Sequence, residues 1–213
     1  MNLEKLEQEM KSCKKCSDIL LKYNIMPKPI FGGKQNCKIM LLGQAPGISE
    51  YESGKPFKGG TGKSIKQLFS DCGLEDFDKN VYQTSVVKCF PGRKEGLSTD
   101  RKPSKIEIQN CSSFLIKQIE FIKPEIIVCL GMVSWKSIIE LKEKEEPHFI
   151  KNFFGEDLSK LKVKHIVGRT FNYKNSKIIP LIHPSGAANG ARSLNKIEHE
   201  KSIKILKENL KIN

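Results

Sequence analysis

The sequence lacks any apolar run of about 18 residues, the length that a membrane-spanning helix requires. Its first residues, MNLEKLEQEMKSCKKC, mix charges of both signs and hold no apolar stretch typical of a secretory signal. Internal repeats, low-complexity tracts and long linkers are also missing. These absences argue against a membrane-spanning or repeat protein, and we expect one cytoplasmic domain over residues 1–213.

Acidic residues are too few to balance the basic ones. The 213 residues include 37 Lys and Arg against 24 Asp and Glu, which leaves a formal net charge of +13 at pH 7. Such an excess favours a polyanionic partner, because neutralising phosphates releases condensed counterions. Lysines spread over an ordinary surface would give the same total. We favour nucleic acid as the partner.

Seven cysteines are many for a chain expected in the cytosol, where grouped thiols usually bind metal or take part in catalysis. Cys37 and Cys129 lie in the strand-like segments CKIMLLG and EIIVCLG, and we expect both to be buried. Cys13 and Cys16 form a C-x2-C pair whose thiolates can reach one metal centre. Spacing alone leaves zinc, an iron–sulfur cluster and an accidental pair all open.

Short apolar runs alternate with helical patterns along the chain. Four runs predict buried strands, at residues 38–42, 81–87, 125–130 and 177–182. Four segments predict helices, at residues 62–72, 105–122, 134–142 and 197–210. The alternation predicts a single-domain, three-layer α/β/α fold with a central, mostly parallel, four-stranded sheet. A ligand then binds outside the carboxyl ends of the strands, where the loops GQAPG, VKCFPG and HPSG follow.

Two loop segments allow more than one interpretation. Residues 91–104 are polar and basic, which predicts a surface loop that either touches DNA phosphate or is simply solvated.

The second segment, the run GGTGKS, is similar to a phosphate-binding loop. That motif requires glycine where Phe57 stands and a strand directly before it, so we reject a nucleotide triphosphatase.

The cysteine segments CKKC, TSVVKCFPG and EIQNCSSFLIKQIEFIKP, with two loop motifs, resemble the family 4 uracil-DNA glycosylases. The loop motifs are GQAPGISEYESGKPFKGGTGKSIKQLF at residues 43–69 and LIHPSGAANG at residues 181–190. The resemblance runs from residue 13 to about residue 192. It implies the uracil-DNA glycosylase fold and a monofunctional, monomeric enzyme that flips uracil or a modified pyrimidine out of DNA and excises it, leaving an abasic site. It also implies a [4Fe-4S] cluster held by Cys13, Cys16, Cys89 and Cys111.

The resemblance assigns site residues as well. His183, Gln44 and Glu50 are the candidate catalytic residues, and His183 would donate a hydrogen bond to the departing base. Phe57 would stack on the flipped base. The remaining candidates contact substrate or DNA: Gly43, Ala45, Gly47, Ser85 and Ser185 at the base and sugar, and Lys58, Lys63 and Arg192 on DNA.

Two departures from the family pattern leave the substrate open. Gln44 replaces a glutamate and cannot accept a proton, although Glu50 or Glu52 could supply a base. Ser85 replaces an asparagine that reads the uracil edge, which enlarges the pocket there. The Cys89-to-Cys111 spacer is also longer than usual, and its extra length falls in residues 91–104. Two alternatives follow: an anti-phage glycosylase for a bulky cytosine such as a glucosylated one, and a non-catalytic protein that binds damaged or single-stranded DNA.

The residue that would replace the flipped nucleotide in the duplex is a further prediction. In the family it comes shortly after His-Pro-Ser, but residues 186–188 are all small here. Arg192 and Leu194 are the candidate substitutes.

Overall fold

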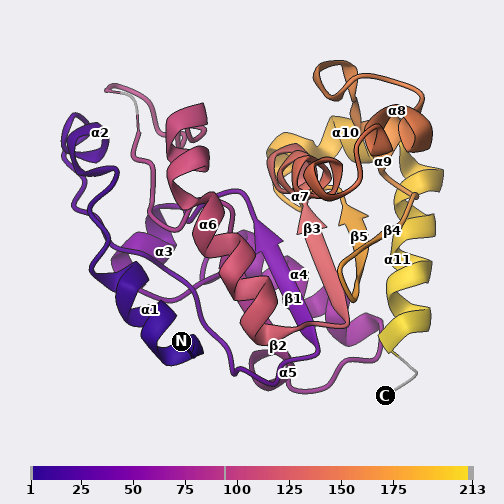
Figure 1. Cartoon of the computed structure of the whole chain (residues 1–213), viewed down its shortest axis with the longest axis horizontal. Coiled ribbons are helices and arrows are strands. Elements are labelled where there is room, and N and C mark those ends of the chain that lie inside the picture. Colours follow the sequence, from indigo (N-terminus) through magenta and orange to yellow (C-terminus); the bar gives the residue numbers. More distant parts are fainter. Residues whose placement is uncertain (1, 94, 211–213) are drawn as a thin grey trace.

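A five-stranded sheet runs through the molecule in the computed structural model, which describes residues 2–93 and 95–210 (Figure 1). The strands are β1 (Ile39–Gly43), β2 (Val81–Ser85), β3 (Ile126–Leu130), β4 (Phe171–Tyr173) and β5 (Ser176–Leu181). Their order is β2-β1-β3-β5-β4. β1, β2, β3 and β5 are parallel, and β4 is antiparallel to β5. The mostly parallel sheet is confirmed.

The predicted count of four strands is wrong by one. The extra strand, β4, has three residues at the sheet edge and pairs with β5 through a tight turn in which Lys174 has φ +51°. Three residues with a central, exposed asparagine are too short to show the two-residue alternation that marks a strand in sequence.

Helices cover both faces of the sheet, which gives the three layers that alternation predicts (Figure 1). Met40 and Leu42 of β1 point into one core, while Ile39 and Leu41 point into the other, since successive strand residues face opposite sides. The first core is covered by α1 (Leu3–Lys11), α6 (Lys105–Ile122), α7 (Gly131–Glu145) and α8 (Phe149–Phe154). The second is covered by α4 (Gly60–Asp71), α5 (Phe77–Asn80) and α11 (Lys196–Leu210).

Shorter elements complete the fold: α2 (Ser17–Leu21), α3 (Ile48–Ser53), α9 (Val163–Ile166), α10 (Asn189–Leu194) and the 3-10 turns Leu158–Lys160 and Gly186–Ala188. Within residues 2–93 and 95–210, no helix is both long and apolar enough to cross a membrane. Cys37 and Cys129 are buried, as predicted.

Helix α6 has the predicted bounds because its ends carry strong local signals. Ser104 accepts a hydrogen bond from the Glu107 amide, and the Glu107 carboxylate accepts one from the Ser104 amide. Lys123 ends the helix in a left-handed conformation. α7 begins at Gly131, three residues before the predicted start, directly where β3 ends.

Candidate functional site

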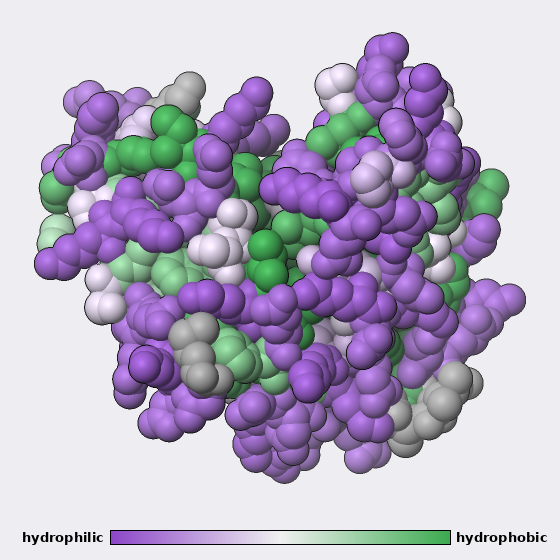
Figure 2. Space-filling view, viewed as in Figure 1, coloured by the Kyte–Doolittle hydropathy of each residue, from purple (hydrophilic) through white to green (hydrophobic). Residues whose placement is uncertain are grey.

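A cleft of about 850 Å³ opens at the carboxyl ends of the parallel strands. Small-molecule sites typically measure about 300–1,000 Å³. Figure 2 shows the surface hollowed at this end of the sheet, between the α6 and α7 sides. The cleft lining includes residues at the end of each parallel strand or shortly after it, with Gly43, Gln44, Ser85, Gly131 and His183 among them. The position expected from the topology is therefore where the structure has its cleft.

Gly43, Phe57 and Ser85, all predicted to contact the base, lie together in this cleft. A Cβ on Gly43 would lie 3.1 Å from Cζ of Phe57 and 3.2 Å from Oγ of Ser85. Glycine therefore leaves room for the aromatic ring above the end of β1. Phe57 has φ +47°, a conformation that side chains rarely adopt. Its carbonyl oxygen lies only 1.6 Å from where a Cβ on Gly62 would be, so glycine in GGTGKS serves this close approach.

His183 follows β5 and is held by its neighbour Ser185. Its Nδ1 lies 2.9 Å from Oγ of Ser185 and accepts a hydrogen bond from the Ser185 amide at 3.3 Å. A lone pair on Nδ1 leaves the proton on Nε2 of the neutral ring. Burial lowers the pKa of His183, and the nearby positive charge of Arg192 lowers it further. The result is a neutral imidazole whose Nε2–H can donate.

Arg192 binds the His183 loop itself. Its guanidinium donates to the carbonyl of His183, to the carbonyl of Ser185 at 3.1 Å and to the side chain of Asn189. These hydrogen bonds hold Arg192 against its own loop, and the DNA contact predicted for it stays a prediction. Lys58 and Lys63 are exposed, next to Phe57 and in the first turn of α4 respectively.

Glu50, a predicted catalytic residue, is held by backbone amides. Its Oε2 accepts the amide of Gly47 at 2.9 Å, and its Oε1 accepts the amide of Gly59 at 3.0 Å. The carboxylate thus ties the loop after β1 to the start of α4. Gln44 and Ala45 are half-buried in the cleft lining beside it.

Residues 95–100 of the 91–104 loop are exposed, in line with the surface loop predicted there, and Pro91, Arg93 and residues 98–102 also line the cleft. Arg93 Nε donates to Asp100 Oδ1 at 2.7 Å, and the Arg101 amide donates to the Gly92 carbonyl at 3.0 Å. Arg101 also donates two hydrogen bonds to the buried carboxylate of Glu107, at 2.6 and 2.8 Å. The capping signal at Ser104 and Glu107 was the only sequence sign that this loop is anchored.

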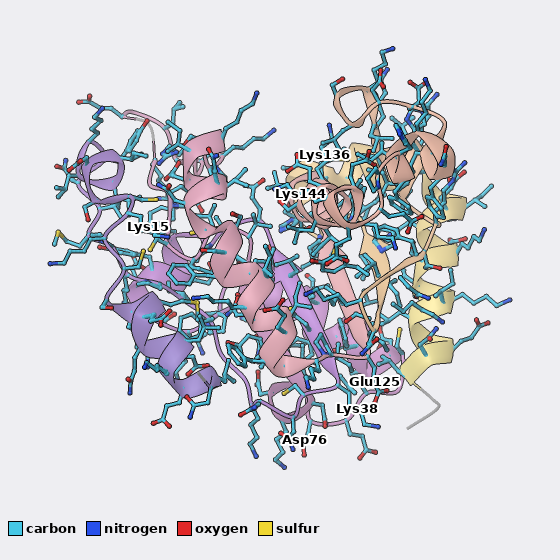
Figure 3. The ribbon with its side chains drawn as sticks, in the orientation of Figure 1. Lys15, Lys38, Asp76, Glu125, Lys136 and Lys144 are labelled. Carbon is cyan, nitrogen blue, oxygen red and sulfur yellow. The ribbon has the colours of Figure 1, made fainter. Side chains whose placement is uncertain are left out.

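Four cysteines from three segments of the chain line one cavity. Cys13 and Cys16 lie between α1 and α2, Cys89 follows β2, and Cys111 lies in α6. The other walls are mostly apolar and include Met10, Leu20, Pro27, Pro29, Val87 and Phe114. Figure 3 shows Lys15, between the paired cysteines, beside α6, and its ammonium lies 5.2 Å from the ring centroid of Phe114.

The donor set of this cavity, four thiols, suits a thiolate-bound metal ion or cluster. Among residues 2–93 and 95–210, no three His, Cys, Asp or Glu side chains lie close enough together to hold a single metal ion. A tetrahedral zinc site would bring its four sulfurs to about 2.3 Å from one point. Burial raises the pKa of Cys89 to about 12, so metal binding would have to displace its proton.

The family model for the uracil DNA glycosylase superfamily matches residues 29–207. The chain belongs to the uracil-DNA glycosylase superfamily. It is 35% identical to the type-4 uracil-DNA glycosylase of Sulfurisphaera tokodaii over 87% of this chain and 76% of that protein. It is 31% identical to the type-4 enzyme of Archaeoglobus fulgidus over 86% of this chain and 82% of that protein. For the type-4 enzyme of Pyrobaculum aerophilum the identity is 36%, over 66% of each chain. The prediction of a DNA glycosylase, a hydrolase of N-glycosyl bonds, is confirmed, and DNA is its partner.

Lys88 of this glycosylase connects the cysteine cavity with the cleft, a link that the sequence did not reveal. The side chain is buried, and its Nζ donates to Oγ1 of Thr84 at 3.0 Å and to the carbonyl of Ser85 at 2.5 Å. Cys89 follows it directly, and both Lys88 and Cys111 line the cavity. One buried lysine, whose pKa burial lowers to about 7, therefore lies between the candidate cluster ligands and the candidate base-contacting residue Ser85.

Proposed function

We propose that this glycosylase excises uracil from DNA. The observation that supports this most directly is the donor geometry of His183, held by Ser185 in the same cleft as Phe57 and Gly43. The type-4 uracil-DNA glycosylases to which the chain is similar support uracil as the base.

In the proposed reaction, the uracil nucleotide turns out of the duplex into the cleft. The Phe57 ring stacks on the base and offsets part of the lost base stacking. As the glycosidic bond stretches, negative charge develops on uracil, and His183 Nε2–H stabilises it. A fixed donor in a partly buried site contributes about 3 kcal/mol to such a step.

A modified cytosine is the second candidate substrate, because of the hydroxyl side chains that line the cleft. Ser85 is shorter than the amide expected there, and Ser98 and Thr99 of the 91–104 loop add hydroxyl groups to the cleft. Such groups suit a polar substituent on the pyrimidine, as in a glucosylated cytosine.

We propose that Cys13, Cys16, Cys89 and Cys111 hold a [4Fe-4S] cluster. Four thiols in one mostly apolar cavity are the donor set of such a cluster. When bound, the cluster would cross-link the N-terminal segment to β2 and α6, a structural function. Anaerobically purified protein should be brown, absorb near about 400 nm and contain iron and sulfide. A colourless protein containing stoichiometric zinc would contradict the assignment.

We propose DNA contacts for side chains that are exposed near the cleft. Lys58 and Lys63 are exposed close to the Phe57 loop and suit phosphate contacts. Leu194, at the end of α10, is 86% exposed, whereas Arg192 is engaged within its own loop. We therefore favour Leu194 as the residue that enters the duplex, with the enzyme acting as a monomer.

The test incubates purified protein with oligonucleotides that carry uracil, hypoxanthine, hydroxymethylcytosine or glucosylated cytosine, and reveals abasic sites with alkali. Cleavage at uracil is the expected result. Cleavage only at a modified cytosine would select the second candidate, and no cleavage on any substrate, with binding retained, would refute both.

A further inference from the structure

We propose that Asp100, in the 91–104 loop, is the carboxylate that accepts the proton of the attacking water. This inference rests on the proposed excision reaction. It assigns to the loop a catalytic function that Gln44 cannot perform, since an amide does not take up a proton.

Hydrolysis of the glycosidic bond requires a group that accepts a proton from the attacking water. The water oxygen forms a bond to C1′ of the sugar, and the bond from C1′ to the base nitrogen breaks. The electron pair of that bond leaves with the base, where His183 stabilises the negative charge. One proton of the water must then pass to a base, and a carboxylate close to the sugar can accept it and also stabilise the positive charge that develops on the sugar.

Among the described residues that line the cleft, Glu50 and Asp100 are the carboxylates. Glu50 uses one oxygen for the amide of Gly47 and the other for the amide of Gly59. Protonation of Glu50 would weaken the contacts that join two loops of the cleft. Asp100 is therefore the better proton acceptor.

Asp100 approaches the loop after β1 closely. Its Oδ2 lies 2.9 Å from where a Cβ on Gly47 would be, and Oε2 of Glu50 lies at the same distance from that point. The two oxygens are therefore separated by at most twice that distance. The absent side chain at Gly47 leaves the space that the Asp100 carboxylate occupies, and 34% of the Asp100 side chain remains open to water.

The Asp100 carboxylate is held in position on both sides. Arg93 donates to its Oδ1 at 2.7 Å and pairs with it through an antiparallel bridge. The next residue, Arg101, is fixed by its buried ion pair with Glu107, in which both side chains are at most 7% exposed. Arg93 leaves Oδ2 as the oxygen on the Gly47 side.

The test measures single-turnover excision of uracil from a single-stranded oligonucleotide by the full chain and by Asp100→Asn. A positioned general base contributes about 10²–10⁴-fold, so we expect the rate to fall at least about 100-fold with unchanged DNA affinity. Adding Gln44→Glu to that variant should restore most of the rate, because it returns a carboxylate to the cleft.

Glu95→Gln is the matched control, since Glu95 is exposed in the same loop and outside the cleft lining. It should behave like the parent. Arg93→Gln removes the ion pair and keeps the Asp100 carboxylate. If its excision rate falls as far as that of Asp100→Asn, only the geometry of the loop matters and the inference is overturned. An Asp100→Asn rate equal to the parent's would overturn it as well. A parent that excises no uracil would instead refute the proposed function.

Discussion

Replacing Arg101 by methionine tests whether the loop that lines the cleft is rigidly anchored. The Arg101 and Glu107 side chains are 7% and 1% exposed, and two hydrogen bonds join them. The guanidinium carbon also lies 4.3 Å from the ring centroid of Tyr23. Arg101→Met leaves the Glu107 carboxylate buried without its cation, which costs about 3–5 kcal/mol of unfolding free energy. For a domain of this size, that corresponds to a melting temperature lower by roughly 6–20 °C.

Trp135, the single tryptophan of the sequence, is 2% exposed and reports unfolding by its fluorescence. Lys160→Met is the control, because its ion pair with Asp157 is 67% exposed on both sides and contributes at most about 1 kcal/mol. The double variant Arg101→Met/Glu107→Gln removes the buried charge, keeps an acceptor for the Ser104 amide and should recover part of the loss. A loss for Arg101→Met no larger than that of the control would refute the buried-pair reasoning.

The same pair predicts an acid dependence of stability. Burial alone would raise the pKa of Glu107, but the hydrogen bonds from Arg101 and Ser104 outweigh it and hold the pKa below its ordinary value of 4.5. The folded state therefore gains stability above about pH 4.5 and loses it as the pH falls through the lowered pKa. Arg101→Met should reduce this acid dependence in unfolding titrations.

Three further predictions concern the site. His183→Ala should lower the single-turnover excision rate about 10²–10³-fold while DNA binding persists. Equal excision rates for this variant and the parent would contradict the donor function. NMR titration of the parent should place the pKa of His183 below 6.5. Lys88→Met leaves the Ser85 carbonyl without this donor, so the unfolding free energy should fall by about 1–3 kcal/mol. Iron should also be lost faster to a chelator. Parent-like stability and iron retention would contradict a connection between the cysteine cavity and the cleft through Lys88. Leu194→Ala should slow excision from duplex DNA and spare single-stranded DNA, and an equal effect on both would rule out entry into the duplex.

The sheet and its ligand-binding end could be predicted because both follow from local patterns. The four parallel strands are short apolar runs, and the carboxyl ends of parallel strands meet at one edge. The three-residue β4 could not be found, because its stability comes from pairing with β5 and from packing of Tyr173. Helix α6 was predicted to the residue, and its N-terminal capping pair, Ser104 and Glu107, lies within four positions of the sequence.

The sequence motifs predicted which residues lie together in the cleft and in the cysteine cavity. His183, Phe57 and Gly43 line one cleft, and the four cysteines line one cavity, as their motifs suggested. What the sequence could not show is tertiary pairing. Arg192 binds carbonyls of its own loop, and the carboxylate of Glu50 is held by two backbone amides. Such partners depend on the conformation of each loop and on side-chain rotamers, which the spacing of residues in the sequence does not determine.

Release of free uracil from a uracil-containing oligonucleotide, measured under single-turnover conditions, tests the proposed function most directly. The parent protein should release uracil and leave an alkali-labile abasic site, and His183→Ala should do so about 10²–10³-fold more slowly. A cluster-loaded parent that binds the oligonucleotide and releases no uracil would contradict the proposal.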